Sequence, residues 1–166
     1  MEFGFSKELD LLREMYKKFA ETEIKPLAEE LDEEERFPVE SIPKLARYGF
    51  MGIPFPKEYG GAGGNYLTYA MAIEELGKVC GTTAVVVSAH TSLCAGPIYY
   101  FGTEEQKQKY LVPLAKGEKI GAFGLTEPSA GTDSSMQQTT AKLEGDEYVL
   151  NGTKVFITKQ VYFVVL

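Results

Sequence analysis

The 166-residue sequence has no tryptophan, one histidine and two cysteines, and it is short of positive charge. Lysine and arginine number 17 against 24 aspartate and glutamate residues, which gives a formal net charge of -7. Proteins that bind nucleic acid neutralise phosphates with clustered lysine and arginine, and no such cluster with interleaved aromatic residues occurs here. The composition therefore argues against a nucleic-acid partner.

Long apolar runs are also missing. No stretch approaches the roughly 20 apolar residues that span a bilayer, and the N-terminus lacks the basic and apolar regions of a secretion signal. We therefore expect a cytoplasmic protein without a membrane partner. Cys80 and Cys94 match no metal-ligand spacing, and His90 lies four residues before Cys94 without a third ligand, so we predict a core helix and no metal site.

The first 118 residues carry the signatures of helices. Apolar residues recur at three- and four-residue steps after Ser6, which is a good N-cap, and Pro26 should kink or divide this first helix. Thr103 and Gln106 form a capping box; the helix that follows should turn Tyr110 inward together with two leucines. The predicted helices cover residues 6–35, 39–48, 65–79, 82–100 and 103–116, and the almost wholly apolar fourth helix should be buried.

After residue 119 the pattern changes to that of strands. Residues 120–125 read as one strand, residues 139–158 as two or three antiparallel strands with turns at 144–146 and 151–152, and residues 161–166 as one more. The sequence thus predicts an α+β fold. An all-helical bundle domain (1–118) is followed by the first strands of an antiparallel β-domain (119–166), which is incomplete.

Between the first two predicted strands lies the turn T-E-P-S-A-G-T-D, residues 126–133. It offers three hydroxyls within seven residues, together with backbone N–H groups, and such a turn can wrap an anion or the edge of a heteroaromatic ring. A loop whose serine and threonine cap its own backbone fits the spacing equally well. We expect Asp133 to cap a turn and Glu127 to support the turn's structure.

The segment G-L-T-E-P-S-A-G-T-D closely resembles the signature of the acyl-CoA dehydrogenases, which are FAD-dependent flavoproteins. The resemblance continues in order through most of the chain. The other matching segments are S-K-E-L-D-L-L-R-E-M, Y-G-F-M-G-I-P-F-P-K-E-Y-G-G-A-G-G, M-A-I-E-E-L-G-K, S-L-C-A-G-P-I-Y-Y-F-G-T-E-E-Q-K-Q-K-Y-L-V-P-L and N-G-T-K-V-F-I-T. S-L-C-A-G-P and G-A-F-G-L-T-E-P are most similar to the short-chain, butyryl-CoA-type branch.

The resemblance implies that the turn binds FAD. Thr126 matches the residue that hydrogen-bonds the pyrimidine side of the flavin, with the backbone of Phe123 and Leu125 alongside. Thr132 matches a position near the FAD pyrophosphate and the acyl-CoA, so it is also the expected substrate-binding residue.

The resemblance places the second part of the flavin site in the segment V-F-I-T. Phe156 matches the aromatic residue that covers one flavin face, and Thr158 matches the hydroxyl that reaches flavin N5, with Ile157 between them. Family members usually continue with Asn where this sequence has Lys159.

The implied reaction oxidises a short-chain acyl-CoA to a 2-enoyl-CoA. In the family a carboxylate removes the substrate α-proton while the β-hydride passes to flavin N5, and that base lies in a C-terminal helical domain. We therefore expect no catalytic residue in this chain, and neither Glu127 nor Asp133 is assigned that role.

The implied partners are an electron-transfer flavoprotein and further copies of the full-length chain, as a homo-oligomer (a tetramer or dimer). Two alternatives remain. The chain is a non-catalytic helical binding module, or it belongs to a related flavoprotein such as an acyl-CoA oxidase.

Overall fold

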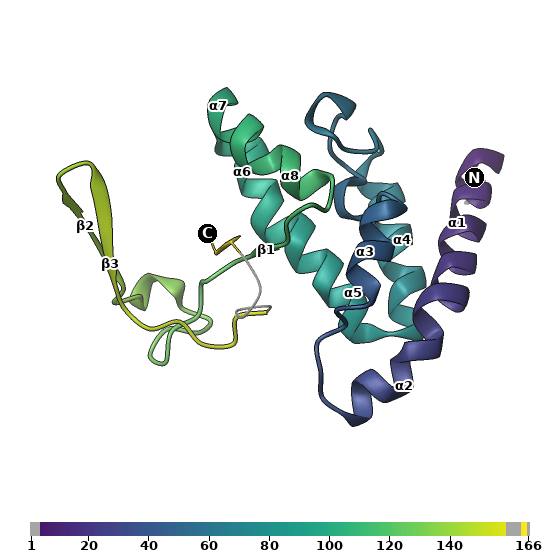
Figure 1. Cartoon of the computed structure of the whole chain (residues 1–166), viewed down its shortest axis with the longest axis horizontal. Helices are drawn as coiled ribbons and strands as arrows, with labels where there is room; N and C mark the ends of the chain where they lie inside the picture. The colour runs from purple at the N-terminus through teal and green to yellow at the C-terminus, as the bar shows by residue number, and fades with distance from the viewer. Residues whose placement is uncertain (1–3, 159–163, 166) are drawn as a thin grey trace.

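A computed structural model describes residues 4–158, 164 and 165, and it confirms the predicted α+β fold (Figure 1). Helices occupy the first part of the chain, and short strands follow. The helices are α1 (Lys7–Phe19), α2 (Lys25–Glu33), α3 (Ser41–Arg47), α4 (Tyr66–Val79), α5 (Gly81–Ser88), α6 (Gly96–Phe101), α7 (Glu104–Gln106) and α8 (Val112–Ala115); the strands are β1 (Gly121–Ala122), β2 (Thr140–Glu144), β3 (Glu147–Asn151) and β4 (Val164–Val165). The π-helical segments Ala20–Ile24, Ala89–Ala95 and Lys107–Leu111 connect α1 to α2, α5 to α6 and α7 to α8.

The first predicted helix is divided as expected. The Ser6 side chain accepts a hydrogen bond from the Leu9 N–H (3.3 Å) and so caps α1. Pro26 lies in the first turn of α2, where a missing backbone N–H removes no bond within that helix. The π-helical segment Ala20–Ile24 lies between the two helices and connects them.

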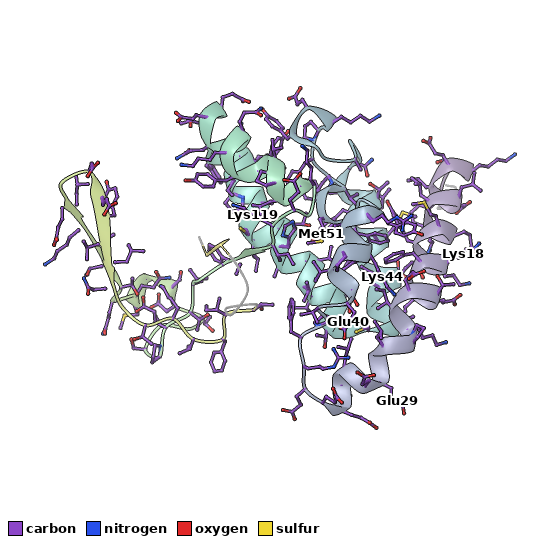
Figure 2. The ribbon with its side chains drawn as sticks, viewed as in Figure 1. Lys18, Glu29, Glu40, Lys44, Met51 and Lys119 are labelled. Atoms are coloured by element: carbon purple, nitrogen blue, oxygen red, sulfur yellow. The ribbon has the colours of Figure 1, made fainter. Side chains whose placement is uncertain are left out.

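The main core lies where α1, α3 and α4 meet the loop at residues 50–53. The rings of Tyr16 and Phe19 contact Phe50 at centroid distances of 5.3 and 4.5 Å. Met51 lies fully buried between the helices, whereas Lys18 extends from the outer side of α1 (Figure 2). Because one apolar stripe of each of these helices is covered in this way, they share one core cluster. A second buried cluster, which includes Phe55, Ile98 and Leu114, lies where residues 89–101 and 107–115 pack together.

The helical rod formed by α5 and α6 is buried on one side only. Val86, Val87 and Cys94 are buried, but Leu93 is exposed and Phe101 keeps 87% of its surface in solvent. The prediction of a buried helix therefore holds for one side of this rod, and its other side is exposed. Its neighbours α4, α8 and β1 pack on one face, and the apolar composition gave no sign of which face would remain uncovered.

The rod formed by α7 and α8 begins at the predicted capping box. The Thr103 N–H donates to the Gln106 side chain (2.8 Å), and the Gln106 N–H donates to the Thr103 hydroxyl (3.3 Å). Leu111 and Leu114 are buried, but Tyr110 is exposed, contrary to expectation. Leu111 and Leu114 are three residues apart and share the inward face, so the residue directly before Leu111 points elsewhere.

The strands form two small sheets. β2 and β3 are an antiparallel hairpin in which Thr140 faces Asn151, and Gly145 takes the left-handed conformation of its turn (φ 69°). β1 pairs in parallel with β4, Gly121 opposite Val164. Residues 152–158 continue as irregular chain. The prediction for residues 139–158 was two or three antiparallel strands, and two of them, β2 and β3, form. Of the strand predicted at 161–166, residues 161–163 and 166 lie outside the described residues.

His90 connects the helical unit to β1. Its ring is fully buried; Nδ1 accepts from the Gly121 N–H (3.0 Å), and Nε2 lies 3.2 Å from the Leu114 carbonyl oxygen. Because Gly121 can only donate, the ring is neutral with its proton on Nε2, which donates to Leu114. No group of three or more potential metal ligands occurs among the described residues, and His90 and Cys94 are core residues, as expected.

We predict that His90→Ala lowers the free energy of unfolding by roughly 2–4 kcal/mol, because the Gly121 N–H and the Leu114 carbonyl lose their buried partner and a cavity remains. Urea unfolding followed by circular dichroism measures this loss. Ser92→Ala, at an exposed position of the same helical segment, is the control and should change the value by less than about 0.5 kcal/mol. A loss below about 1 kcal/mol for His90→Ala would contradict the bridging role.

Candidate functional site

The residues proposed to bind a ligand lie on two segments, residues 121–133, which comprise β1 and the turn, and residues 152–158. In Figure 1 both run between the helical unit and the β2–β3 hairpin. They meet directly, since the Val155 N–H donates to the Thr126 carbonyl oxygen (2.8 Å). The site is therefore built from segments on either side of the hairpin.

A buried carboxylate is the centre of this arrangement. Glu127 is only 4% exposed, and its side chain accepts from the Gln138 N–H (2.6 Å), the Thr139 N–H (3.0 Å) and Lys154 Nζ (2.8 Å). The Lys154 ammonium, followed by the hydrogen bonds around Thr139 and Gln138, lowers the pKa of Glu127 to about 2. As expected, Glu127 supports the structure of the turn; an ionised carboxylate with so low a pKa is a weak proton acceptor.

Lys154 reaches three acceptors at once. Besides Glu127, its Nζ donates to the Leu125 carbonyl (2.9 Å) and to the Gln137 side chain (3.3 Å). The ammonium group has three donors, and all three have a partner here. Lys154 and Val155 together fasten the second segment to residues 125–127 of the first.

The turn itself is closed by its backbone. Glu127 and Ala130 exchange two N–H···O hydrogen bonds of 3.1 Å each, with Pro128 and Ser129 at the tip. Asp133 accepts from the Ser135 N–H (3.1 Å) and hydroxyl (2.5 Å), as the prediction of a capping aspartate required. The backbone and Asp133 thus satisfy several of the turn's own polar groups.

The predicted site residues differ in exposure. Phe123, Thr126 and Ile157 are half-buried, whereas Leu125, Thr132, Phe156 and Thr158 are exposed. Phe156 is the extreme case, with 93% of its surface in solvent and a left-handed backbone (φ 58°). An aromatic residue in this conformation is uncommon. The hydrogen bond described above brings Thr126 and Val155 together, while none of the contacts above joins Thr126 to Thr132, Phe156 or Thr158.

Sequence reasoning missed Lys154. Its three acceptors belong to residues 125, 127 and 137, and nothing in the residues around a single lysine shows which distant oxygens it will reach. The one available signal was its place inside N-G-T-K-V-F-I-T, next to the predicted site residues.

Comparison with known families covers nearly the whole chain. The family described as "Acyl-CoA dehydrogenase, N-terminal domain" matches residues 6–118, and "Acyl-CoA dehydrogenase, middle domain" matches residues 122–163. The chain belongs to the acyl-CoA dehydrogenase family. The resemblance noted in the sequence is thereby confirmed.

Individual relatives agree with this acyl-CoA dehydrogenase assignment. The chain is 67% identical to "Acyl-CoA dehydrogenase, short-chain specific" of Clostridium acetobutylicum, over 95% of this chain and 42% of that protein. The solved butyryl-CoA dehydrogenase from Megasphaera elsdenii is 45% identical with a TM-score of 0.87, over 95% of this chain and 42% of that one. An acyl-CoA dehydrogenase from Bacillus anthracis, solved in complex with FAD, is 37% identical with a TM-score of 0.88, over 97% and 28%.

The acyl-CoA dehydrogenase chain described here spans about two fifths of the length of the curated relatives it matches. Within its described residues, none of the helices combines the length and the apolar character that crossing a bilayer requires.

We predict that ionised Glu127 stabilises the fold in a pH-dependent way. Because folding lowers its pKa from 4.5 to about 2, its contribution is complete above pH 4.5 and is lost as the pH falls from 4.5 towards 2. The difference in unfolding free energy between the wild type and Glu127→Gln should therefore shrink over this interval. Urea unfolding at a series of pH values measures it.

Glu144→Gln is the control for that titration, since Glu144 is an exposed carboxyl at the end of β2. Its difference from the wild type should stay small throughout. A difference for Glu127→Gln that is independent of pH between 4.5 and 2 would show that the charge of Glu127 does not stabilise the fold.

Proposed function

We propose that this chain is the N-terminal portion of an FAD-dependent acyl-CoA dehydrogenase that oxidises a short-chain acyl-CoA to a 2-enoyl-CoA. The observation that carries the proposal is the hydrogen bond from Val155 to Thr126, because it brings the two segments with flavin-binding signatures together. Support for the short-chain substrate comes from the relatives, which are called short-chain specific and butyryl-CoA dehydrogenases.

The residues present fit a flavin. Phe156 offers almost its entire ring to solvent, and Leu125 adds exposed apolar surface on the adjoining segment. A flat aromatic ligand needs apolar cover together with a few well-placed polar groups. The hydroxyls of Thr126 and Thr158 can supply these polar groups, so the flavin ring needs no contact with a positively charged side chain.

Each residue is assigned a role. Thr126, with the backbone of Phe123 and Leu125, binds the pyrimidine side of the isoalloxazine, and Thr132 lies towards the pyrophosphate and the acyl-CoA. Phe156 covers one ring face and excludes water from it, while Ile157 and Thr158 complete the contact near N5. Bound FAD supplies the acceptor for the substrate's β-hydride.

The general base is assigned to a part of the full-length protein outside these residues. Glu127 is committed to Lys154 and two backbone N–H groups, and Asp133 is committed to Ser135, so neither carboxylate is available for the substrate α-proton. We further propose that the helical unit (1–118) and the β unit (119–166) are separate domains of a cytoplasmic homo-oligomer. That oligomer passes electrons to an electron-transfer flavoprotein.

The test is flavin content and activity of the longest natural form of the protein that contains this chain. We expect a yellow protein that oxidises butyryl-CoA. Thr126→Val and Phe156→Ala should each weaken FAD binding about five- to thirtyfold, the equivalent of about 1–2 kcal/mol, by removing a hydrogen bond or the ring cover. Titration with FAD, followed by flavin fluorescence, measures the change.

Tyr148→Ala is the matched control, because Tyr148 is an exposed aromatic residue of β3 that has no assigned role in the site. It should leave the FAD affinity unchanged. A full-length protein that binds no FAD would refute the proposed function, and one that binds FAD without oxidising butyryl-CoA would refute the substrate assignment alone.

A further inference from the structure

We propose that Lys154 is a positioning residue that sets the direction of the Thr126 backbone N–H towards the flavin. This inference rests on the proposed function and adds to it a residue outside the set that contacts the cofactor. It follows from four of the hydrogen bonds described above and from the planarity of the peptide bond.

The first step concerns the peptide between Leu125 and Thr126. Lys154 Nζ holds its carbonyl oxygen at 2.9 Å. In a planar trans peptide the C=O and the N–H point in opposite directions. Because the Leu125 oxygen is held towards Lys154, the N–H of Thr126 is directed away from this lysine and from its hydrogen bond to Glu127.

The second step concerns the next peptide, between Thr126 and Glu127. Its carbonyl oxygen accepts from Val155 (2.8 Å), and its N–H donates to the Ala130 carbonyl (3.1 Å). Both of its polar groups are used within the protein. In the preceding peptide, Lys154 holds the Leu125 oxygen, and the N–H of Thr126 points to the opposite side and makes none of the hydrogen bonds described above.

The third step explains why a lysine is suited to this position. Its ammonium is balanced by Glu127, whose side chain is 4% exposed, and hydrogen bonds between charged groups are the stronger kind. Lys154 also lies two residues before Phe156, so the same side chain fixes the pyrimidine-binding peptide relative to the segment that carries the ring cover. A neutral side chain of equal length would free that peptide to rotate.

The experiment compares variants of the full-length protein saturated with FAD. Lys154→Met keeps an unbranched side chain one atom shorter than lysine and removes the donors; we expect the FAD Kd to rise about tenfold and the visible absorption and circular-dichroism bands of the bound flavin to shift. Lys154→Arg retains charge and donors and should restore both. Lys142→Met, at an exposed lysine of β2, is the matched control and should behave as the wild type.

The flavin bands separate positioning from a merely structural role, because they are recorded when every molecule carries FAD. Urea unfolding of the FAD-free variants measures any general loss of stability independently. If Lys154→Met does not fold, Glu127→Gln decides in its place, since it removes the partner charge and should shift the same bands.

A folded Lys154→Met protein with wild-type bands and a Kd within twofold of the wild type would overturn the inference and leave the proposed function standing. Failure of Lys154→Arg to restore the bands would overturn it as well. A wild-type protein without FAD binding would overturn both proposals, and that result is seen before any variant is made.

Discussion

The ionised carboxylate of Glu127 is the constraint on which the candidate site depends. A charge with 4% exposure is costly unless donors surround it. Those donors come from Gln138 and Thr139 at the start of the hairpin and from Lys154 after it. Satisfying one buried charge therefore fixes the positions of three stretches of chain relative to one another, and the surface they share follows from that requirement.

His90 is a second buried polar group that fixes the chain, here as a neutral ring between the helical unit and β1. It binds the last turn of the helical unit through Leu114 and the first strand through Gly121. The strand that leads into the turn thus starts from a fixed point in the helical core. Together, His90 and Glu127 define both ends of the path from residue 121 to residue 127, which explains how a two-residue strand can position a site.

Much of the helical unit could be predicted because its signals are local. Each of these signals depends on residues close in sequence to the feature that it produces. Examples are the caps at Ser6 and Thr103 and the division of the first helix near Pro26. The exposed sides of α5–α6 and of Tyr110 could not be predicted, because they depend on which neighbours pack there. The site residues were named by resemblance; spacing alone left the turn ambiguous, and Lys154 was missed because its acceptors are distant in sequence.

The parallel pairing of β1 with β4 has a consequence for the order of folding. Gly121 lies only a few residues after the last helix, but its partner Val164 lies beyond the entire hairpin. Contacts between residues near in sequence form faster than contacts that close long loops. During synthesis the helical unit is complete while Val164 has yet to be added. We therefore expect β1 to be in place on the helical unit, held by His90, before β4 pairs with it.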